Sequence, residues 1–265
     1  MPRRRDMPML VLMTVLSAFA GGAWADDDGR LARLIPELAP PPANEALVQI
    51  PDTGRKLLAL RSYVRAGSNL AKRWSWTDDE IEAFKGSTEQ QALLAEIAAV
   101  NAHFAEANPG YELYVNSTVR SLDVQIERWN KNESVGVAAA EILAAWEDDH
   151  GADAGASGDA GPKELRSWLS AFEGTKRSNL AAPGLTAHGR GHAIDFQVMK
   201  DGRIVAGADS RQIETVWRAE KWDVKLKDSM DAAGPSFSGP LTSPNEPWHY
   251  DYDPAADTQT ATSGD

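Results

Sequence analysis

One strand-like segment limits the folds open to this chain more than any other feature. Residues 193–198 alternate in character with the period of two that a β-strand shows. As a strand, the segment would have two different faces: Ala193, Asp195 and Gln197 on one, and Ile194, Phe196 and Val198 on the other. The apolar row must be covered by other elements, and Asp195 becomes a carboxylate at a rigid position. Because one side of that carboxylate is covered, it must be paired or metal-bound to avoid a desolvation cost.

Helical patterns dominate the rest of the chain. Apolar side chains repeat at helical spacing in residues 54–106, 122–146, 165–172 and 212–222, and Thr77 with Glu80 forms a capping box. Further strands or extended segments are predicted at residues 111–115, 203–206 and 244–252. This mixture predicts an α+β fold, in which a small, mainly antiparallel sheet carries the candidate site and helices from the first half of the chain flank it.

The chain begins with the three-part pattern of a secretory signal peptide. Arg3, Arg4 and Arg5 precede an apolar run over residues 7–20, and a small-x-small ending follows at 23–25. Cleavage after Ala25 would give a periplasmic or secreted protein. A membrane anchor is the alternative, but a spanning helix needs about 20 apolar residues and this run is shorter. A twin-arginine export route is a further alternative, which the residues after the arginines do not strengthen.

The mature chain divides into four predicted parts. They are an extended Pro- and Ala-rich lead-in at 26–53, a helical region at 54–107, a domain at 108–253 and a disordered tail at 254–265. Within the third part, residues 150–161 consist mainly of Gly, Ala, Asp and Ser and predict a flexible surface loop.

Composition excludes several partners and chemistries. The 265 residues are 42% apolar and 25% charged, as in ordinary globular proteins. The formal charge is −12, and the signal peptide carries a net +2, so its removal leaves −14. A surface this acidic repels nucleic acid and anionic membrane lipids. No cysteine is present, so any metal ion must be held by His, Asp or Glu.

Two short segments carry candidate metal ligands. His188 lies in a glycine-rich loop just before the predicted strand, where neighbouring glycines let the backbone bend close to an ion. Further along, Glu246 precedes His249 by three residues. A regular strand would place these two on opposite faces, so a shared site needs a bend, which Pro247 could impose. Each histidine alone would be read as an ordinary loop or strand residue.

Two imidazoles and one carboxylate form a candidate catalytic set. His188, Asp195 and His249 would supply three ligands and leave the fourth position of a tetrahedral zinc site open for water, as catalytic zinc sites do. Zinc lowers the pKa of bound water to about 7. Glu246 is then the candidate base that takes a proton from this water as a carbonyl is attacked.

Two other residues are weaker candidates. His192 follows His188 by four residues, but a glycine stands where the two-histidine helix of other zinc peptidases requires glutamate, so that motif is rejected. His192 could still line the site. Arg120 ends a short predicted strand, and its guanidinium could grip a substrate carboxylate or polarise the scissile carbonyl. A surface salt bridge is the alternative for Arg120.

At these residues the sequence resembles the D-alanyl-D-alanine carboxypeptidases of the vancomycin-resistance type. The wider group includes lysostaphin-like peptidases and the amino-terminal domain of sonic hedgehog. The family motif Ser-x-His-x-x-Gly-x-Ala-x-Asp is matched by His188, Gly191, Ala193 and Asp195, with Thr186 in place of the serine. The motif Glu-x-Trp-His is matched by Glu246, Trp248 and His249. An upstream Ser-x-x-Arg-Ser is matched by Ser117, Arg120 and Ser121, with Thr118 and Val119 in place of the usual Gly-Tyr.

The resemblance covers residues 111–252 and implies a role for each matched position. It implies zinc bound by His188, Asp195 and His249, base catalysis by Glu246, and contact of Arg120 with the substrate or transition state. The further candidate substrate contacts are Ser117, Gln125, Thr186, His192 and Trp248. The region before residue 111 is not explained by the resemblance.

The leading hypothesis is therefore an exported zinc D-alanyl-D-alanine carboxypeptidase that acts on peptidoglycan stem peptides and is not inserted in the membrane after signal cleavage. Three alternatives stay open. They are a peptidoglycan endopeptidase of the same family, a non-catalytic zinc-containing module that binds a peptide or protein, and a structural protein whose histidines are incidental.

Overall fold

A computed structural model describes residues 25–151 and 161–254. The predicted signal peptide, except Ala25, lies outside the described residues, as do most of the predicted loop at 150–161 and all but the first residue of the predicted tail. Within the two described ranges, no helix has the combination of length and apolar character that crossing a membrane requires.

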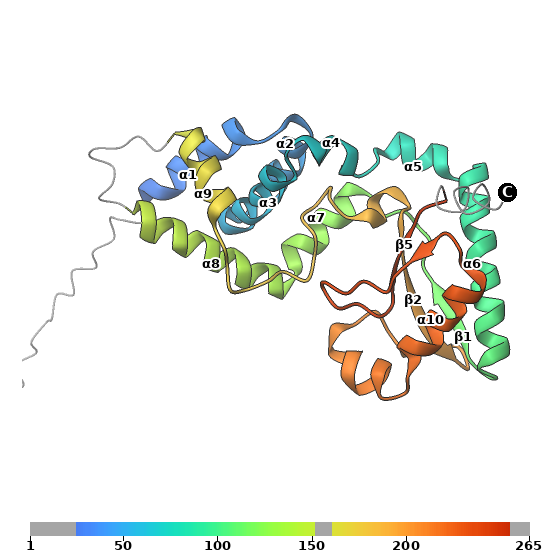
Figure 1. Cartoon of the computed structure of the whole chain (residues 1–265). Helices are drawn as coiled ribbons and strands as arrows, with labels where there is room; N and C mark the ends of the chain where they lie inside the picture. The colour runs from blue at the N-terminus through green and yellow to red at the C-terminus, as the bar shows by residue number, and fades with distance from the viewer. Residues whose placement is uncertain (1–24, 152–160, 255–265) are drawn as a thin grey trace, which may run out of the picture.

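The described chain forms ten α-helices, several single-turn helices and five strands (Figure 1). The α-helices are α1 Ala25–Leu38, α2 Pro41–Val48, α3 Thr53–Ala66, α4 Leu70–Arg73, α5 Asp78–Phe84, α6 Thr88–Ala107, α7 Leu122–Lys131, α8 Glu133–His150, α9 Pro162–Ala171 and α10 Trp222–Ala233. The strands are β1 Glu112–Val115, β2 Ala193–Lys200, β3 Arg203–Ala206, β4 Phe237–Ser238 and β5 His249–Tyr252. The other short elements are η1 Gly67–Asn69, η3 Ala187–Arg190, η4 Ser210–Gln212 and η5 Ile213–Arg218, the last of which is a π-helix.

The strands form one antiparallel sheet in the order β1-β2-β5-β4, with β3 also paired to β2. The predicted α+β class is therefore confirmed. In the pairing of β2 with β5, Asp195 lies directly opposite His249. This register brings together two candidate ligands that are 54 positions apart in the sequence.

The apolar face of β2 is the one predicted from its alternation. Ile194, Phe196 and Val198 are 2%, 0% and 0% exposed and pack with side chains of α6 and α10, such as Phe104 and Leu226. Figure 1 shows these two helices beside the sheet. The opposite face of β2, which carries Asp195, is consequently the one left for a site.

A second hydrophobic cluster lies away from the sheet and is built by helices alone. It joins α1, α2, α3 and α4 to α7, α8 and α9, around fully buried Tyr63, Trp129 and Trp146. We call this part the helical lobe, and we call the part formed by the sheet with α5, α6 and α10 the sheet lobe. The two lobes lie side by side in Figure 1, and α7 begins at the junction between them.

The predicted lead-in at 26–53 is wrong, because most of this segment is helical. Four apolar side chains repeat at helical spacing and are buried in the helical lobe: Leu31, Leu34, Ile35 and Leu38. The prolines do not break α2, since Pro41 and Pro42 occupy its first turn, where no backbone N–H is needed. Proline content thus misled the interpretation of a segment whose apolar spacing is that of a helix.

The two lobes also divide the chain differently from the predicted boundary at 107/108. The helix α6 belongs to the sheet lobe, whereas α7, α8 and α9 belong to the helical lobe although they follow the first strand. The chain therefore crosses between the lobes more than once. Residues from both lobes reach the junction for this reason.

Two further predictions are corrected near the carboxyl end. The predicted helix at 212–222 is present but shorter, as the π-helix η5 over Ile213–Arg218, and a separate helix, α10, follows at Trp222–Ala233, where no helix was predicted. The predicted extended segment at 244–252 is a strand only over His249–Tyr252. The residues before this strand form turns, and this local difference shapes the candidate site.

Candidate metal centre

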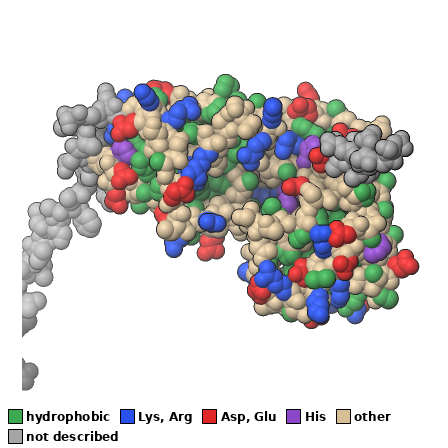
Figure 2. Space-filling model, in the orientation of Figure 1, with side chains coloured by type: hydrophobic (Ala, Val, Ile, Leu, Met, Phe, Trp, Pro, Cys, Tyr) green, Lys and Arg blue, Asp and Glu red, His purple; other side chains and the backbone are tan. Residues whose placement is uncertain are grey.

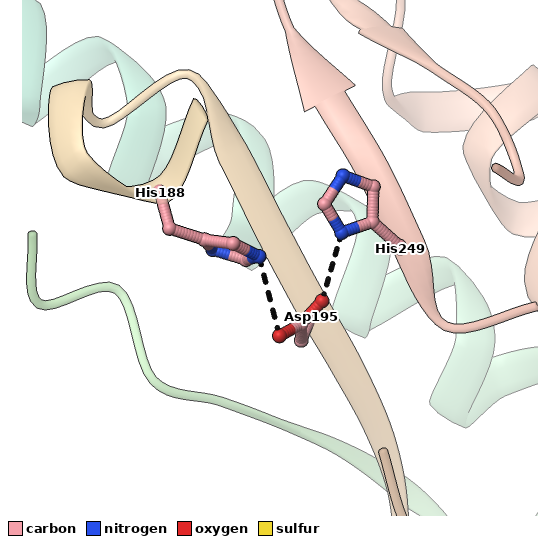
Figure 3. Close-up of side chains that lie close together, drawn as sticks. All are labelled: His188, Asp195 and His249. Carbon is pink, nitrogen blue, oxygen red and sulfur yellow. Dashed lines mark hydrogen bonds and ion pairs between the residues drawn. The ribbon is translucent and has the colours of Figure 1, made fainter. Parts of the chain in front are cut away.

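Three side chains meet near the beginning of β2 in a group that could hold a metal ion. They are the predicted ligands His188 from η3, Asp195 from β2 and His249 from β5, and one ligand atom of each lies within 4.8 Å of the others. The Asp195 carboxylate lies between the two rings, with Oδ2 3.4 Å from His188 Nε2 and Oδ1 3.1 Å from His249 Nδ1 (Figure 3). His249 is 8% exposed, and the side chains of His188 and Asp195 are 13% and 25% exposed, so the group lies partly below the surface.

The loop before β2 places His188 over the strand. It forms the single turn η3 and then reverses at Gly191, whose φ of +67° lies in the left-handed region that favours glycine. The carbonyl of His188 accepts a hydrogen bond from the backbone N–H of Arg120 at 3.0 Å. The two motifs that carry His188 and Arg120 are thereby fixed to each other.

Gly189 lets this loop lie against buried side chains. A Cβ at this position would lie 2.1 Å from Ser75 Oγ and 2.6 Å from Gln125 Nε2. Ser75 and Gln125 are 4% and 6% exposed, so neither can move away freely. The loop would have to shift, and the adjacent His188 would shift with it.

We therefore expect Gly189→Ala to weaken metal binding at least about 10-fold and to destabilise the fold by about 1–3 kcal/mol, the usual cost of overpacking. Calorimetric metal titration and thermal unfolding measure the two effects. Gly207→Ala is the matched control, because a Cβ there would meet its nearest neighbours at ordinary contact distances from 3.5 Å. Unchanged metal affinity in Gly189→Ala would contradict the role given to this close approach.

Glu246 reaches the group through a turn. The backbone N–H of Glu246 donates to Leu241 O at 2.9 Å, and that of His249 donates to Glu246 O at 3.1 Å. The chain thus reverses before β5 begins, and Glu246 Oε2 lies 3.7 Å from His249 Nδ1. The bend that a shared site required is present, and the buried Pro247 lies within it.

Acidic groups surround His249 and change its protonation. Burial alone would lower the pKa of His249, but hydrogen bonds to Asp195 and Asp251 and the charge of Glu246 raise it to about 9. Burial alone would raise the pKa of Asp195, but hydrogen bonds to His188 and His249 outweigh burial and lower it. Without a metal ion, the ring of His249 therefore carries a proton and a positive charge that the surrounding carboxylates stabilise. A metal ion that binds here can replace this proton.

This raised pKa predicts that metal binding releases a proton. Because the pKa of His249 is about 9 without metal, its ring is protonated at pH 7 and must lose the proton to act as a ligand. We expect about one proton released at pH 7 and an apparent affinity that rises about tenfold per pH unit toward pH 9. Metal titrations in buffers of different ionisation enthalpy measure the released protons. Binding without proton release would show that His249 is not a ligand.

The pKa of Glu246 is also raised, but by burial, whereas hydrogen bonds and nearby charges raise that of His249. Burial raises the pKa of Glu246 most, and the charge of Asp195 adds to this, against the opposing charges of His249 and Arg120. A carboxylate with a raised pKa is a stronger base than an exposed glutamate. The guanidinium of Arg120 lies 3.9 Å from Asp195 Oδ2, so it faces the same group.

The group opens into a cavity of about 410 Å³ that residues of both lobes line. Figure 2 shows a hollow between the two lobes in which basic, acidic and histidine side chains meet. The predicted site residues that line the cavity are Arg120, Gln125, Thr186, His188, Asp195, Glu246, Trp248 and His249. The structure therefore brings eight of the ten predicted site residues to one place.

Gln125 has a different role from the predicted substrate contact. Its amide nitrogen donates to Arg120 O at 2.8 Å and to Ser75 Oγ at 2.9 Å, and its carbonyl oxygen accepts from Gly184 N at 2.8 Å. These protein partners occupy the amide. Gln125 therefore positions Arg120 and the loop before β2.

Two predicted contacts are not among the residues that line the cavity, Ser117 and His192. His192 Nδ1 lies 3.1 Å from the carbonyl of Tyr252, and its ring packs edge-on against Trp76. Gly191 lies between the two histidines with a left-handed backbone conformation, so the side chains of His188 and His192 point in different directions. Ser117 is half-buried just after β1. These two positions are corrections to the predicted site.

Several residues that line the cavity were not predicted. Asp251 lies two positions after His249 on β5, and its Oδ1 lies 3.4 Å from His249 Nε2. The strand period could have revealed it, because residues two apart share a face. Arg128 lies three positions after Gln125 on α7, so helical spacing could have revealed it too. Asn179, Leu180 and Ala181 come from an irregular segment that carries no such signal.

Comparison with known proteins adds no relative to this picture. No protein-family model matches the sequence, and no curated protein or solved structure matches it. The description of a group that could hold a metal ion consequently stands on the geometry of the chain itself.

Proposed function

We propose that this chain is an exported zinc peptidase that acts as a D-alanyl-D-alanine carboxypeptidase on peptidoglycan stem peptides. One observation carries the proposal: a two-histidine, one-aspartate group shares a cavity with a half-buried glutamate and an arginine. The family resemblance assigned these same five residues their roles from the sequence. Their convergence from separate parts of the chain supports that assignment.

The donor set fits zinc. Two imidazoles and one carboxylate are the kind of ligands that catalytic zinc sites use, and three protein ligands leave a position open. The lowered pKa of Asp195 keeps its carboxylate ionised, as a ligand must be. Asp251 accepts from the other nitrogen of His249, the second contact that orients ligating histidines in metal sites.

When bound here, zinc would supply Lewis-acid chemistry that polarises a carbonyl and acidifies a coordinated water. The chain supplies the remaining functions. Glu246, half-buried beside His249, accepts the proton from the attacking water and can pass it to the leaving amine. Arg120, whose side chain is 22% exposed, directs its guanidinium toward the group and can stabilise negative charge that develops on the carbonyl oxygen.

The cavity suits a short peptide segment. A volume of about 410 Å³ falls within the range of small-ligand sites and exceeds what a metal ion alone needs. Its lining mixes small apolar side chains such as Ala181 and Ala208 with charged and amide groups. Small apolar contacts suit alanine side chains, and the polar groups suit peptide bonds and carboxylates.

The proposal is tested with the purified mature protein, residues 26–265. Its metal content is measured by elemental analysis, and it is then incubated with muropeptides that end in D-Ala-D-Ala, with and without chelator. Mass spectrometry of the products is expected to show chelator-sensitive loss of one alanine. Cleavage inside the stem would make the protein an endopeptidase, and bound zinc without any cleavage would favour a binding module. Absence of zinc would overturn the proposal.

A further inference from the structure

A second guanidinium lines the cavity next to Arg120 and belongs to none of the matched motifs. Arg128 lies on α7, three residues after Gln125, and this spacing places both side chains on the face of α7 that borders the cavity. The positive charge of Arg128 lowers the pKa of Arg120, after the larger effect of burial, so the two guanidinium groups are near each other. Two neighbouring cations repel unless an anion lies between or beside them.

The acidic side chains of the cavity do not neutralise Arg128. Asp195, Glu246 and Asp251 all lie within 4.0 Å of His249, on the metal side, and Arg120 is directed at Asp195. The neighbouring Glu127 forms an ion pair with Lys131 at 2.5 Å. Among the described residues, Arg128 forms no ion pair within 4.0 Å. It is therefore the cation of the cavity lining that is left to meet an anion from outside the chain.

We propose that Arg128 forms a carboxylate-binding subsite, so that the cavity selects peptides that carry a free carboxylate at the released residue or elsewhere in the stem. This inference rests on the proposed function and narrows its substrate class. A guanidinium presents paired N–H donors whose geometry matches the two oxygens of a carboxylate. Arg120, the inner guanidinium, faces the reacting group, and Arg128, the exposed outer one, holds the substrate in place.

A stem peptide offers two sources of such a carboxylate. One is the carboxyl terminus of the residue that is released, and the other is a side-chain or α-carboxylate further back in the stem. Three synthetic substrates distinguish them: a stem pentapeptide with all carboxylates free, the same peptide with a terminal carboxamide, and the same peptide with the internal carboxylates amidated. Each is compared in the wild-type protein and in Arg128→Gln, with kcat and KM measured separately.

We expect Arg128→Gln to raise KM for the free pentapeptide about 10-fold with little change in kcat, a loss in the range for one hydrogen bond to a charged group. In the wild-type protein, KM should rise by about the same factor for one of the two amidated peptides. The group that is amidated in that peptide is then the carboxylate that Arg128 binds. For that amidated peptide, Arg128→Gln should raise KM no further, because the contact between the guanidinium and the carboxylate is already absent. Arg128→Lys should give a KM between those of the wild-type protein and Arg128→Gln, since lysine keeps the charge and loses the paired donors.

Arg203→Gln is the matched control, because Arg203 is an exposed arginine at the start of β3 and does not line the cavity. An unchanged KM in Arg128→Gln would overturn the proposal. An equal loss on all three peptides would also overturn it, because it would show long-range attraction and no specific contact.

A binding measurement keeps this test separate from that of the proposed function. Calorimetric titration of zinc-loaded Glu246→Gln protein with the dipeptide D-Ala-D-Ala and with its amide needs no turnover. About 10-fold weaker binding of the acid after Arg128→Gln is added, with no change for the amide, would support a subsite for the terminal carboxylate. If wild type hydrolyses none of the peptides, the proposed function fails, and this titration, repeated with the stem pentapeptide and with its internally amidated form, still decides whether Arg128 binds a carboxylate. Identical affinities in both backgrounds, together with unchanged KM, would overturn the subsite.

Discussion

Replacing Glu246 by glutamine is expected to reduce kcat for D-alanine release by about 100- to 10,000-fold, the range that general-base catalysis contributes. Glutamine has the same shape but cannot accept the proton of the attacking water. The turn before β5 should persist, because its hydrogen bonds at this residue involve the backbone N–H and C=O of Glu246. Release of D-alanine and elemental analysis of the same sample measure activity and metal content together.

Metal content is expected to stay unchanged in Glu246→Gln. The carboxylate of Glu246 is not part of the three-ligand group. Replacing it by an amide also removes its repulsion with Asp195, which helps to raise the pKa of Glu246 in the wild-type protein. Glu220→Gln, an exposed carboxylate on the surface, is the control for loss of one charge. Near-normal kcat in Glu246→Gln would rule out Glu246 as the base.

The second large effect is expected from His249→Ala, which should remove most of the bound metal and with it the activity. If about 10–16 kcal/mol of binding free energy in a four-ligand zinc site is shared evenly, one ligand accounts for about 3 kcal/mol, or at least about 100-fold in affinity. Competition with a chelator of known affinity measures the change. His249→Ala is thus expected to lose the metal ion, whereas Glu246→Gln is expected to keep the metal ion and lose only catalytic activity.

His192→Ala is the control for that experiment. His192 lies close to His188 in the sequence, yet its ring is directed at Tyr252 O and Trp76. We expect its removal to leave metal affinity within about twofold. Comparable metal loss in His192→Ala and His249→Ala would mean that the ligands have been assigned to the wrong histidines.

The parts of the site that could be predicted from the sequence depend on short-range rules. The period of two along β2 identified the buried row at Ile194, Phe196 and Val198 and the opposite position of Asp195. The absence of cysteine restricted the ligands to His, Asp and Glu. Combined with the family resemblance, these rules predicted a three-residue group that the structure brings within 4.8 Å.

What the sequence did not predict depends on packing between distant segments. Assignment of α6 to the sheet lobe and of α7 to the helical lobe follows from which apolar faces meet in space. Helical spacing from Gln125 could have suggested Arg128, but its position beside Arg120 follows from the junction between the lobes. The error at residues 26–53 was of another kind, because proline content was given more weight than the apolar spacing of Leu31, Leu34 and Leu38.

The most direct test of the account is a zinc titration of chelator-treated protein, in which release of D-alanine from a stem pentapeptide is followed as the metal is added. We expect activity to return and to level off at one zinc per chain, and we expect no return at the same zinc concentrations in His249→Ala. Activity that survives complete metal removal, or that zinc restores equally in His249→Ala, would contradict a zinc-dependent reaction at the group formed by His188, Asp195 and His249.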